Sequence, residues 1–267
     1  MASPLKELFR LRAVAGVAAV VCGLALPAPG QQATQDSAAT RQPVLVELFT
    51  SEGCLDCPPA DKLLQELDAT QFVPGAQAIV LSEHVTYWDR QGWKDPFSLD
   101  EMTDRQQKYE EQFKLEDSFT PQVVVDGAAQ VVGNNMGGVE RLVAAAAAAA
   151  PKPELVIKDA RWEGGAAQFS VQGTAAPVGR LVAVLAADET QSEVSRGENK
   201  GRTLHHVAVV RVMKEFGADA ADGRALKLGG GSLNHGKEAM GPVRLVVFQV
   251  DHYTGRVLAV AEQTLRR

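Results

Sequence analysis

The sequence is short of cysteine and has no excess of positive charge, and each shortage argues against a class of function. Only three of the 267 residues are cysteine, and neither a second C-x-x-C pair nor an H-x-x-x-H pair is present, so a four-ligand structural zinc site is not expected. The formal net charge of −6 disfavours binding to nucleic acids, which requires a basic surface. The glycine-rich residues 228–232 are not followed by the G-K-[ST] pattern of a phosphate-binding loop.

Long apolar runs are missing beyond the N-terminus, so no internal membrane span is expected. Three basic residues among the first twelve precede residues 13–26, which are uncharged and mostly apolar, and small residues follow. This pattern is typical of an export signal, and fourteen residues are short for a membrane anchor. We therefore expect residues 1–30 to be a cleaved signal peptide and residues 31–42 a disordered polar leader. The mature protein is expected in the periplasm or outside the cell, without a membrane span.

Residues 43–150 alternate strand and helix patterns, and the pattern changes after Pro151 and Pro153. From there to residue 267, short strand-like runs separated by glycine, proline and aspartate predict an antiparallel β-sandwich of six to eight strands. In the first part, strands are expected at 43–49, 76–85, 121–127 and 129–133, and helices at 60–69, 98–114 and 137–150. The sequence thus predicts an α/β domain followed by a β-sandwich domain.

The segment Cys54-Leu55-Asp56-Cys57 lies between the first strand and its helix. Removal of the signal peptide leaves Cys54 and Cys57 as the only cysteines, in a compartment that permits disulfides. Such a pair is compatible with a redox site, a metal site or a structural disulfide. A helix N-terminus stabilises a thiolate, so in a redox site Cys54 is expected to attack a disulfide and Cys57 to resolve the mixed intermediate.

This arrangement resembles the thioredoxin fold, and Thr120–Pro121 before the third strand is similar to its cis-proline loop. The resemblance implies that this loop lies against the cysteines and offers backbone groups to an incoming peptide. Thioredoxins also bury a carboxylate that helps to deprotonate the resolving cysteine. Glu47 is the nearest candidate, but it lies one residue further from Cys54 than the usual spacing. It is either that acid/base after a one-residue bulge or a carboxylate on the other face of the strand.

Four blocks in order, VELFTSEGCLDCPPAD, HVTYWDRQGWKDPF, TDRQQKYEEQF and TPQVVVDG, resemble a family of exported bacterial proteins catalogued as domain of unknown function 1223. The resemblance covers nearly all of residues 43–150 and implies a thioredoxin-like core. Family members usually carry two serines between the cysteines, where this chain has Leu55 and Asp56. An acidic Asp56 disfavours the thiolate and argues against a strongly oxidising pair.

The function expected is thiol–disulfide exchange, without a cofactor, on a thiol- or disulfide-bearing protein or a small thiol. One alternative is Cu(I) binding or metal delivery through Cys54, Cys57 and His84, since two thiolates and an imidazole suit that ion. Thioredoxin-fold copper chaperones normally space their cysteines by three residues, which weakens this alternative. The other is a non-catalytic binding protein in which the disulfide is structural.

Tyr87, Trp88 and Trp93 lie close together in a segment with little helical periodicity. They predict either a rim where a substrate docks or an aromatic plug that holds an insertion onto the fold. The polar residues 195–201 predict a turn before the strand that begins at His205 and His206, and this turn either is only a connection or completes the cleft at the cysteines.

Overall fold

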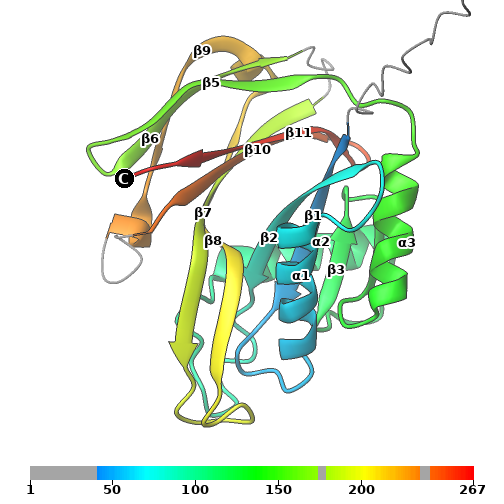
Figure 1. Ribbon diagram of the computed structural model, residues 1–267, viewed down its shortest axis with the longest axis vertical. Helices are drawn as coiled ribbons and strands as arrows, with labels where there is room; N and C mark the ends of the chain where they lie inside the picture. The colour runs from blue at the N-terminus through cyan, green and yellow to red at the C-terminus, as the bar shows by residue number, and fades with distance from the viewer. Residues whose placement is uncertain (1–40, 174–178, 235–240) are drawn as a thin grey trace, which may run out of the picture. The chain divides into compact units, whose positions relative to one another are not determined.

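Two β-sheets and three α-helices make up the part of the chain described by the computed structural model, residues 41–173, 179–234 and 241–267 (Figure 1). The predicted signal peptide and almost all of the predicted leader lie outside these residues. No helix within the described ranges is long and apolar enough to cross a membrane. The elements of the first half are β1 (Gln42–Thr50), α1 (Pro58–Thr70), β2 (Ala76–His84), α2 (Asp100–Phe113), β3 (Gln122–Val125), β4 (Ala129–Val132) and α3 (Met136–Ala147). The elements of the second half are β5 (Leu155–Glu163), β6 (Ala166–Gly173), β7 (Gly179–Glu193), β8 (Thr203–Phe216), η1 (Ala218–Ala221), β9 (Asp222–Gly229), η2 (Gly231–Asn234), β10 (Val243–Asp251) and β11 (Val257–Leu265).

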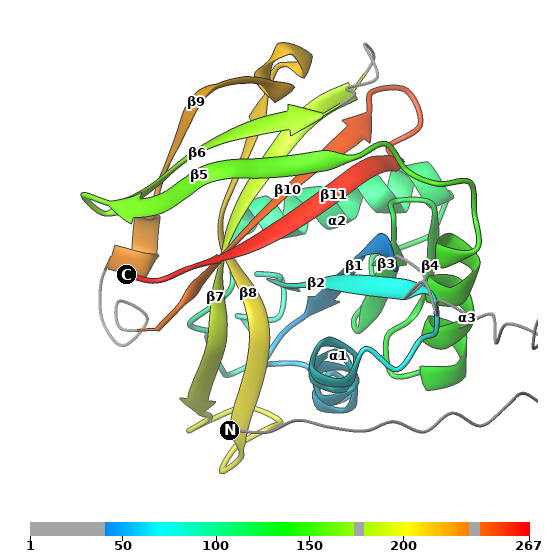
Figure 2. The same ribbon diagram turned by 45° about the horizontal axis from the view of Figure 1, so that its top comes forward.

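The larger sheet contains strands from both halves of the sequence, in the order β11-β10-β7-β8-β2-β1-β3-β4 (Figure 2). Strands β1 and β2 are parallel, as expected for strands joined through a helix, and β3 and β4 form an antiparallel hairpin beside β1. The halves meet where β2 pairs with β8 in parallel at Ser82 and Val209. The order β-α-β-α-β-β-α predicted for residues 43–150 is therefore confirmed, and the second half extends the same sheet.

The helices form for reasons that the sequence shows. Pro58 and Pro59 occupy the first positions of α1, where a missing N–H costs nothing, and the three leucines of this helix face the core. Helix α2 begins at Asp100, two residues later than predicted, because the Ser98 hydroxyl donates to the Asp89 carboxylate instead of capping the helix. Helices α1 and α3 cover one face of the first-half strands, and α2 covers the other (Figure 1).

Two large apolar cores and a smaller cluster around Phe49 and Tyr109 stabilise the described residues. The first lies between the helices and the large sheet and includes Leu48, Leu64 and Ile79 together with Val184 and Val210 of the second half. The second lies between the large sheet and the three-stranded sheet β5-β6-β9. Because the first core takes side chains from both halves, the second half is part of the packing that supports α1.

A buried arginine connects α1 to the second-half strands. The Nη1 and Nη2 atoms of Arg244, on β10, donate to the two carboxylate oxygens of Asp68 on α1 at 2.6 and 2.8 Å. Its Nε donates to Asp188 on β7, and Nη1 lies 3.7 Å from Glu262 on β11. Two parallel bonds to one carboxylate fix the geometry better than a single contact does.

We expect Arg244→Met to lower the free energy of unfolding by about 2–3 kcal/mol, because it leaves partly buried carboxylates without their cation. Arg161→Ala is the control, since its ion pair with Glu163 is largely exposed and should contribute at most about 0.5 kcal/mol. Denaturant unfolding of both variants measures the difference. Equal and small changes would contradict a role for Arg244 in joining the two halves.

Candidate functional site

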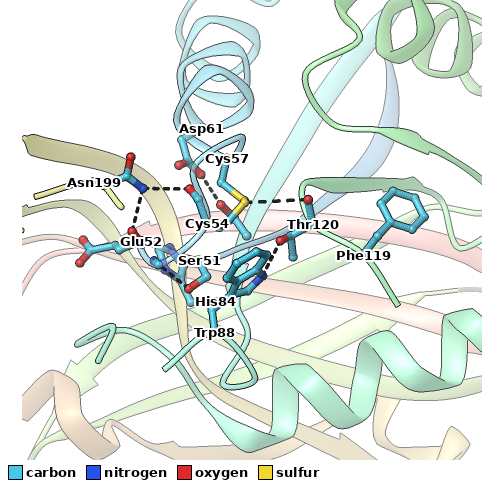
Figure 3. The surroundings of a disulfide bond; sticks show 12 residues. Ser51, Glu52, Cys54, Cys57, Asp61, His84, Trp88, Phe119, Thr120 and Asn199 are labelled. Atoms are coloured by element: carbon cyan, nitrogen blue, oxygen red, sulfur yellow. Dashed lines mark hydrogen bonds between the residues drawn. A yellow bond between two sulfur atoms is a disulfide. The ribbon is translucent and has the colours of Figure 1, made fainter. Parts of the chain in front are cut away.

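Cys54 and Cys57 form a disulfide in the loop that leads from β1 into α1 (Figure 3). Their Cα atoms are 5.5 Å apart, and Cys57 is the N-cap residue of α1. Both cysteines are buried, with 1% and 0% of their surface exposed, whereas Leu55 and Asp56 between them face solvent. Solvent screens the Asp56 charge, which weakens its influence on the cysteines.

The loop at Thr120–Pro121 lies against the disulfide, as the sequence predicts. The peptide bond before Pro121 is cis, and the Thr120 carbonyl oxygen lies 3.9 Å from Cys54 Sγ. Trp88 holds this loop, because its Nε1 donates to the Thr120 hydroxyl at 2.7 Å. The structure thus brings Cys54, Cys57, Thr120 and Trp88 into one site (Figure 3).

The three predicted aromatic residues occupy different positions. Trp93 Nε1 donates to Glu52 Oε2 at 2.8 Å, so Trp93 is hydrogen-bonded to the cysteine loop. Trp88 packs so closely on the cysteine loop that a Cβ at Gly53 would lie 3.1 Å from its own Cβ. This approach accounts for glycine before the first cysteine. Tyr87 is the most exposed of the three, at 37% of its surface. Its hydroxyl group is nevertheless partly buried, and this burial raises the pKa of Tyr87 to about 12.

His84 is fully buried and both of its ring nitrogens have partners. Nδ1 bonds Asp95 Oδ2 at 2.7 Å, and Nε2 lies 3.3 Å from the Ser82 hydroxyl. The same Asp95 oxygen accepts the N–H of Glu52 at 2.8 Å, which ties the aromatic segment to the cysteine loop. Burial alone would raise the pKa of Asp95, but His84 and the backbone N–H groups outweigh it and lower the pKa to about 2. Within the described ranges, no group of three or more His, Cys, Asp and Glu side chains is arranged to hold a metal ion.

Glu47 lies in a second buried cluster, on the face of β1 that α2 covers. Its Oε1 accepts from Arg105 and its Oε2 accepts from the Tyr109 hydroxyl at 2.6 Å. Leu48 and Thr50 point to the opposite face, toward α1 and α3. Of the two positions that the sequence leaves open, Glu47 therefore occupies the other face of the strand. Burial, with the neighbouring Glu47 charge, raises the pKa of Glu83 well above its ordinary value.

Sequence reasoning did not identify three buried charged residues beside the cysteines: Glu52, Asp61 and His206. His206 on β8 places Nε2 3.2 Å from Glu52 Oε1 and Nδ1 3.7 Å from Asp61 Oδ1. Asp61, in the first turn of α1, also accepts the Thr50 hydroxyl at 2.9 Å. The hydroxyl of Ser192 on β7 also donates a hydrogen bond to Glu52 Oε1. Side chains from both halves therefore meet next to the disulfide.

His206 carries the positive charge of this network. Burial alone lowers the pKa of His206, but the carboxylates of Asp61 and Glu52 outweigh it and raise the pKa to about 10. The imidazole is therefore protonated at neutral pH. Its ring packs edge-on against His84, with the ring centroids 4.6 Å apart.

The predicted turn at residues 195–201 lies on the cysteine loop. Asn199, fully buried, donates from Nδ2 to the carbonyl oxygens of Glu52 and Cys54 at 2.8 and 2.9 Å (Figure 3). Gly197, with φ of +73°, packs against Trp93, and a Cβ there would lie 3.0 Å from the Trp93 Cβ. The sequence hypothesis that this turn completes the site at the cysteines agrees with these contacts.

The fold and the site define a mixed α/β protein in which a large sheet carries a buried C-x-x-C disulfide at the start of a helix. The chain belongs to the family described as proteins of unknown function, DUF1223, whose profile matches residues 45–240. The family identified from the four sequence blocks is thus confirmed. No curated protein matches the chain.

Among solved structures, the chain is similar to the crystal structure of a protein from Agrobacterium tumefaciens determined by structural genomics. The two are 24% identical, with a TM-score of 0.60, over 84% of this chain and 93% of that protein. This similarity concerns the fold alone. A β-glucuronidase from Bacteroides uniformis aligns at 12% identity and a TM-score of 0.18, over 43% of this chain and 13% of the enzyme, and that alignment carries no argument.

We expect Asn199→Ala to speed reduction of the disulfide by dithiothreitol about tenfold. Loss of two buried hydrogen bonds costs about 1–3 kcal/mol, and about 1.4 kcal/mol corresponds to a factor of ten in the population of the opened loop. The matched control is Asn134→Ala, since Asn134 is exposed. An unchanged reduction rate in Asn199→Ala would show that the turn at residues 195–201 does not restrict access to Cys54.

Proposed function

We propose that this protein performs thiol–disulfide exchange through Cys54 and Cys57. The observation that carries the proposal is the position of the pair: a disulfide at the N-terminus of α1 with the Thr120 carbonyl next to Cys54 Sγ. Free N–H groups and the positive end of the helix dipole favour a thiolate at this place once the pair is reduced. The substrate class is a thiol- or disulfide-bearing protein or a small thiol, in the periplasm or outside the cell.

We infer that residues 43–150 form a thioredoxin-like unit and that residues 151–267 form a second, β-sandwich unit. The sheet order β2-β1-β3-β4, with one parallel pair and a terminal hairpin, supports the first inference. Packing of the sheet β5-β6-β9 on the extended large sheet supports the second. In this protein, however, residues of the second half also reach the site: Asn199 donates to the Cys54 carbonyl oxygen, and His206 lies beside Asp61.

The two cysteines have different roles in the exchange reaction: Cys54 attacks the substrate, and Cys57 resolves the mixed disulfide. In the reduced protein, the Cys54 thiolate attacks a substrate disulfide, forms a bond to one of its sulfur atoms and expels the other as a thiolate. Cys57 then loses its proton and attacks Cys54 Sγ, which forms the protein disulfide and releases the second substrate thiolate. The protein dithiol loses two electrons and the substrate disulfide gains them, and the reverse reaction oxidises a substrate dithiol.

A structural disulfide is the second candidate, and the burial of Cys54 favours it. With 1% of its surface exposed, Cys54 is reached by a partner only if a covering segment moves. A disulfide that closes so short a loop adds only about 2 kcal/mol of stability, which gives little reason for this spacing. Copper delivery would require reduction of the disulfide and a His84 nitrogen released from Asp95 or Ser82.

We expect Cys57→Ser to accumulate a mixed disulfide through Cys54 when the protein is incubated with oxidised glutathione, because the resolving thiol is gone. Cys54→Ser should accumulate little, since the Thr120 loop that would receive a partner lies against Cys54 Sγ. His84→Ala separates exchange from copper delivery and should leave the adduct yield of Cys57→Ser intact. Intact-mass measurement reads the adduct. No adduct on Cys57→Ser under native conditions would favour the structural disulfide.

A further inference from the structure

We propose that Asp61 accepts the Cys57 proton during exchange and that His206, from the second half of the chain, is the positioning residue that holds Asp61 ready for it. This inference rests on the proposed exchange function and names the acid/base pair that serves it. It differs from the sequence expectation for Glu47, which lies on the other face of the sheet with Arg105 and Tyr109.

The helix places Asp61 next to Cys57. Cys57 already has helical backbone angles, with φ of −79° and ψ of −37°, and the Asp61 N–H donates to its carbonyl at 3.1 Å. Residues four positions apart lie on the same face of a helix, one turn from each other. Both side chains point to the interior, since Cys57 is 0% and Asp61 5% exposed. The Asp61 carboxylate is thus one helical turn from Cys57 and on its side of α1 (Figure 3).

Two polar atoms at this place lack hydrogen-bond partners among the residues that the structure describes: Asp61 Oδ2 and His206 Nδ1. Buried polar atoms without partners are rare and costly, so they call for an explanation. Here the Thr50 hydroxyl and His206 occupy the side of Asp61 Oδ1, which leaves Oδ2 available to receive a proton. A fixed acceptor with one open oxygen suits proton transfer better than a fully bonded carboxylate does.

A path to solvent exists on the His206 side. A cavity of about 480 Å³ between α1 and the β7–β8 pair is lined by His206 together with Gln65, Asp68, Glu189 and Thr190. The Thr190 hydroxyl, directly opposite His206 across the two strands, also has no partner within the described part of the chain. Protons can therefore reach His206 from solvent without passing the disulfide.

The charges around His206 support its role. Glu52 from the cysteine loop and Asp61 from α1 face the imidazole directly, His84 from β2 packs on its ring, and Asp95 binds His84. Glu189 from β7 and Asp68 from α1 border the cavity next to it. The two facing carboxylates outweigh the effect of burial and raise the pKa of His206 to about 10, so a cation stands beside Asp61 at neutral pH. The His206 cation also attracts the Asp61 carboxylate, whose Oδ1 lies 3.7 Å from Nδ1, and holds it in place.

The proton moves in the resolving step. The Cys57 S–H bond breaks, its proton forms an O–H bond on Asp61, and the Cys57 thiolate forms the S–S bond to Cys54 Sγ. The bond from Cys54 to the substrate sulfur breaks at the same time, and the substrate leaves as a thiolate. Asp61 afterwards gives the proton to water from the cavity beside His206, so no further oxidant or reductant is needed.

The experiment follows the reduced protein after mixing with oxidised glutathione, with acid quench and mass measurement at several pH values. In the unchanged protein, the mixed disulfide should resolve at a nearly constant rate from pH about 6 to 8, since the proton acceptor is inside. In Asp61→Asn, resolution should slow at least tenfold near pH 6 and rise about tenfold per pH unit, because only solvent base removes the Cys57 proton. In His206→Gln, the pH profile should shift to higher pH, whereas His252→Gln, at the exposed β10–β11 turn, should match the unchanged protein.

A second measurement does not depend on exchange. In the reduced protein, nuclear magnetic resonance should detect a proton shared between the Cys57 thiol and Asp61, which is called the coupling of these two residues. Both Asp61→Asn and His206→Gln should remove this coupling. If the unchanged protein forms no glutathione adduct but shows the coupling, the exchange function is wrong and the Asp61–His206 pairing stands. If it exchanges, and both variants keep its pH profile and the same Cys57 titration, the inference is overturned.

Discussion

The buried contact between Glu52 and His206 is the interaction on which the site depends. It joins the cysteine loop of the first half to β8 of the second half, at 3.2 Å and without exposure to solvent. An isolated charge is too costly to bury, so the two residues and Asp61 must come together for the loop to close. Trp93, Ser192 and Asn199 then complete the hydrogen bonds of the loop. The second half of the chain is thereby part of the site and not only an appended domain.

The contacts that fix the geometry of the disulfide also restrict access to it. The disulfide is held with its loop, the Thr120 carbonyl and the helix N-terminus in fixed relation, which is what exchange needs. The same contacts bury Cys54, so exchange requires a movement of the covering segments. Leu55, Asp56 and Tyr87 are exposed next to the site, and a partner that approaches the cysteines would contact them.

Much of the fold could be predicted from the sequence because it is determined by local patterns. Strand and helix periodicity, the prolines after Cys57 and the Thr120–Pro121 pair each act within a few residues, and the four sequence blocks identify the family. The positions of Asp61 and His206 could not be predicted in the same way, since they meet only after β2 pairs with β8 at a single bridge. A local signal for Asp61 exists, because it follows Cys57 by four residues on a helix. No such signal exists for His206, whose alternation with the exposed His205 shows only that one of the two faces inward.

The reduction potential of the Cys54–Cys57 pair tests the central claim most directly, because it decides between exchange and a structural disulfide. Equilibration of the purified protein with glutathione redox buffers, followed by thiol trapping, measures it. We expect a potential between about −270 and −180 mV, the range of pairs that exchange with protein and small-molecule thiols. A potential below about −300 mV, where structural disulfides of exported proteins lie, would contradict the account.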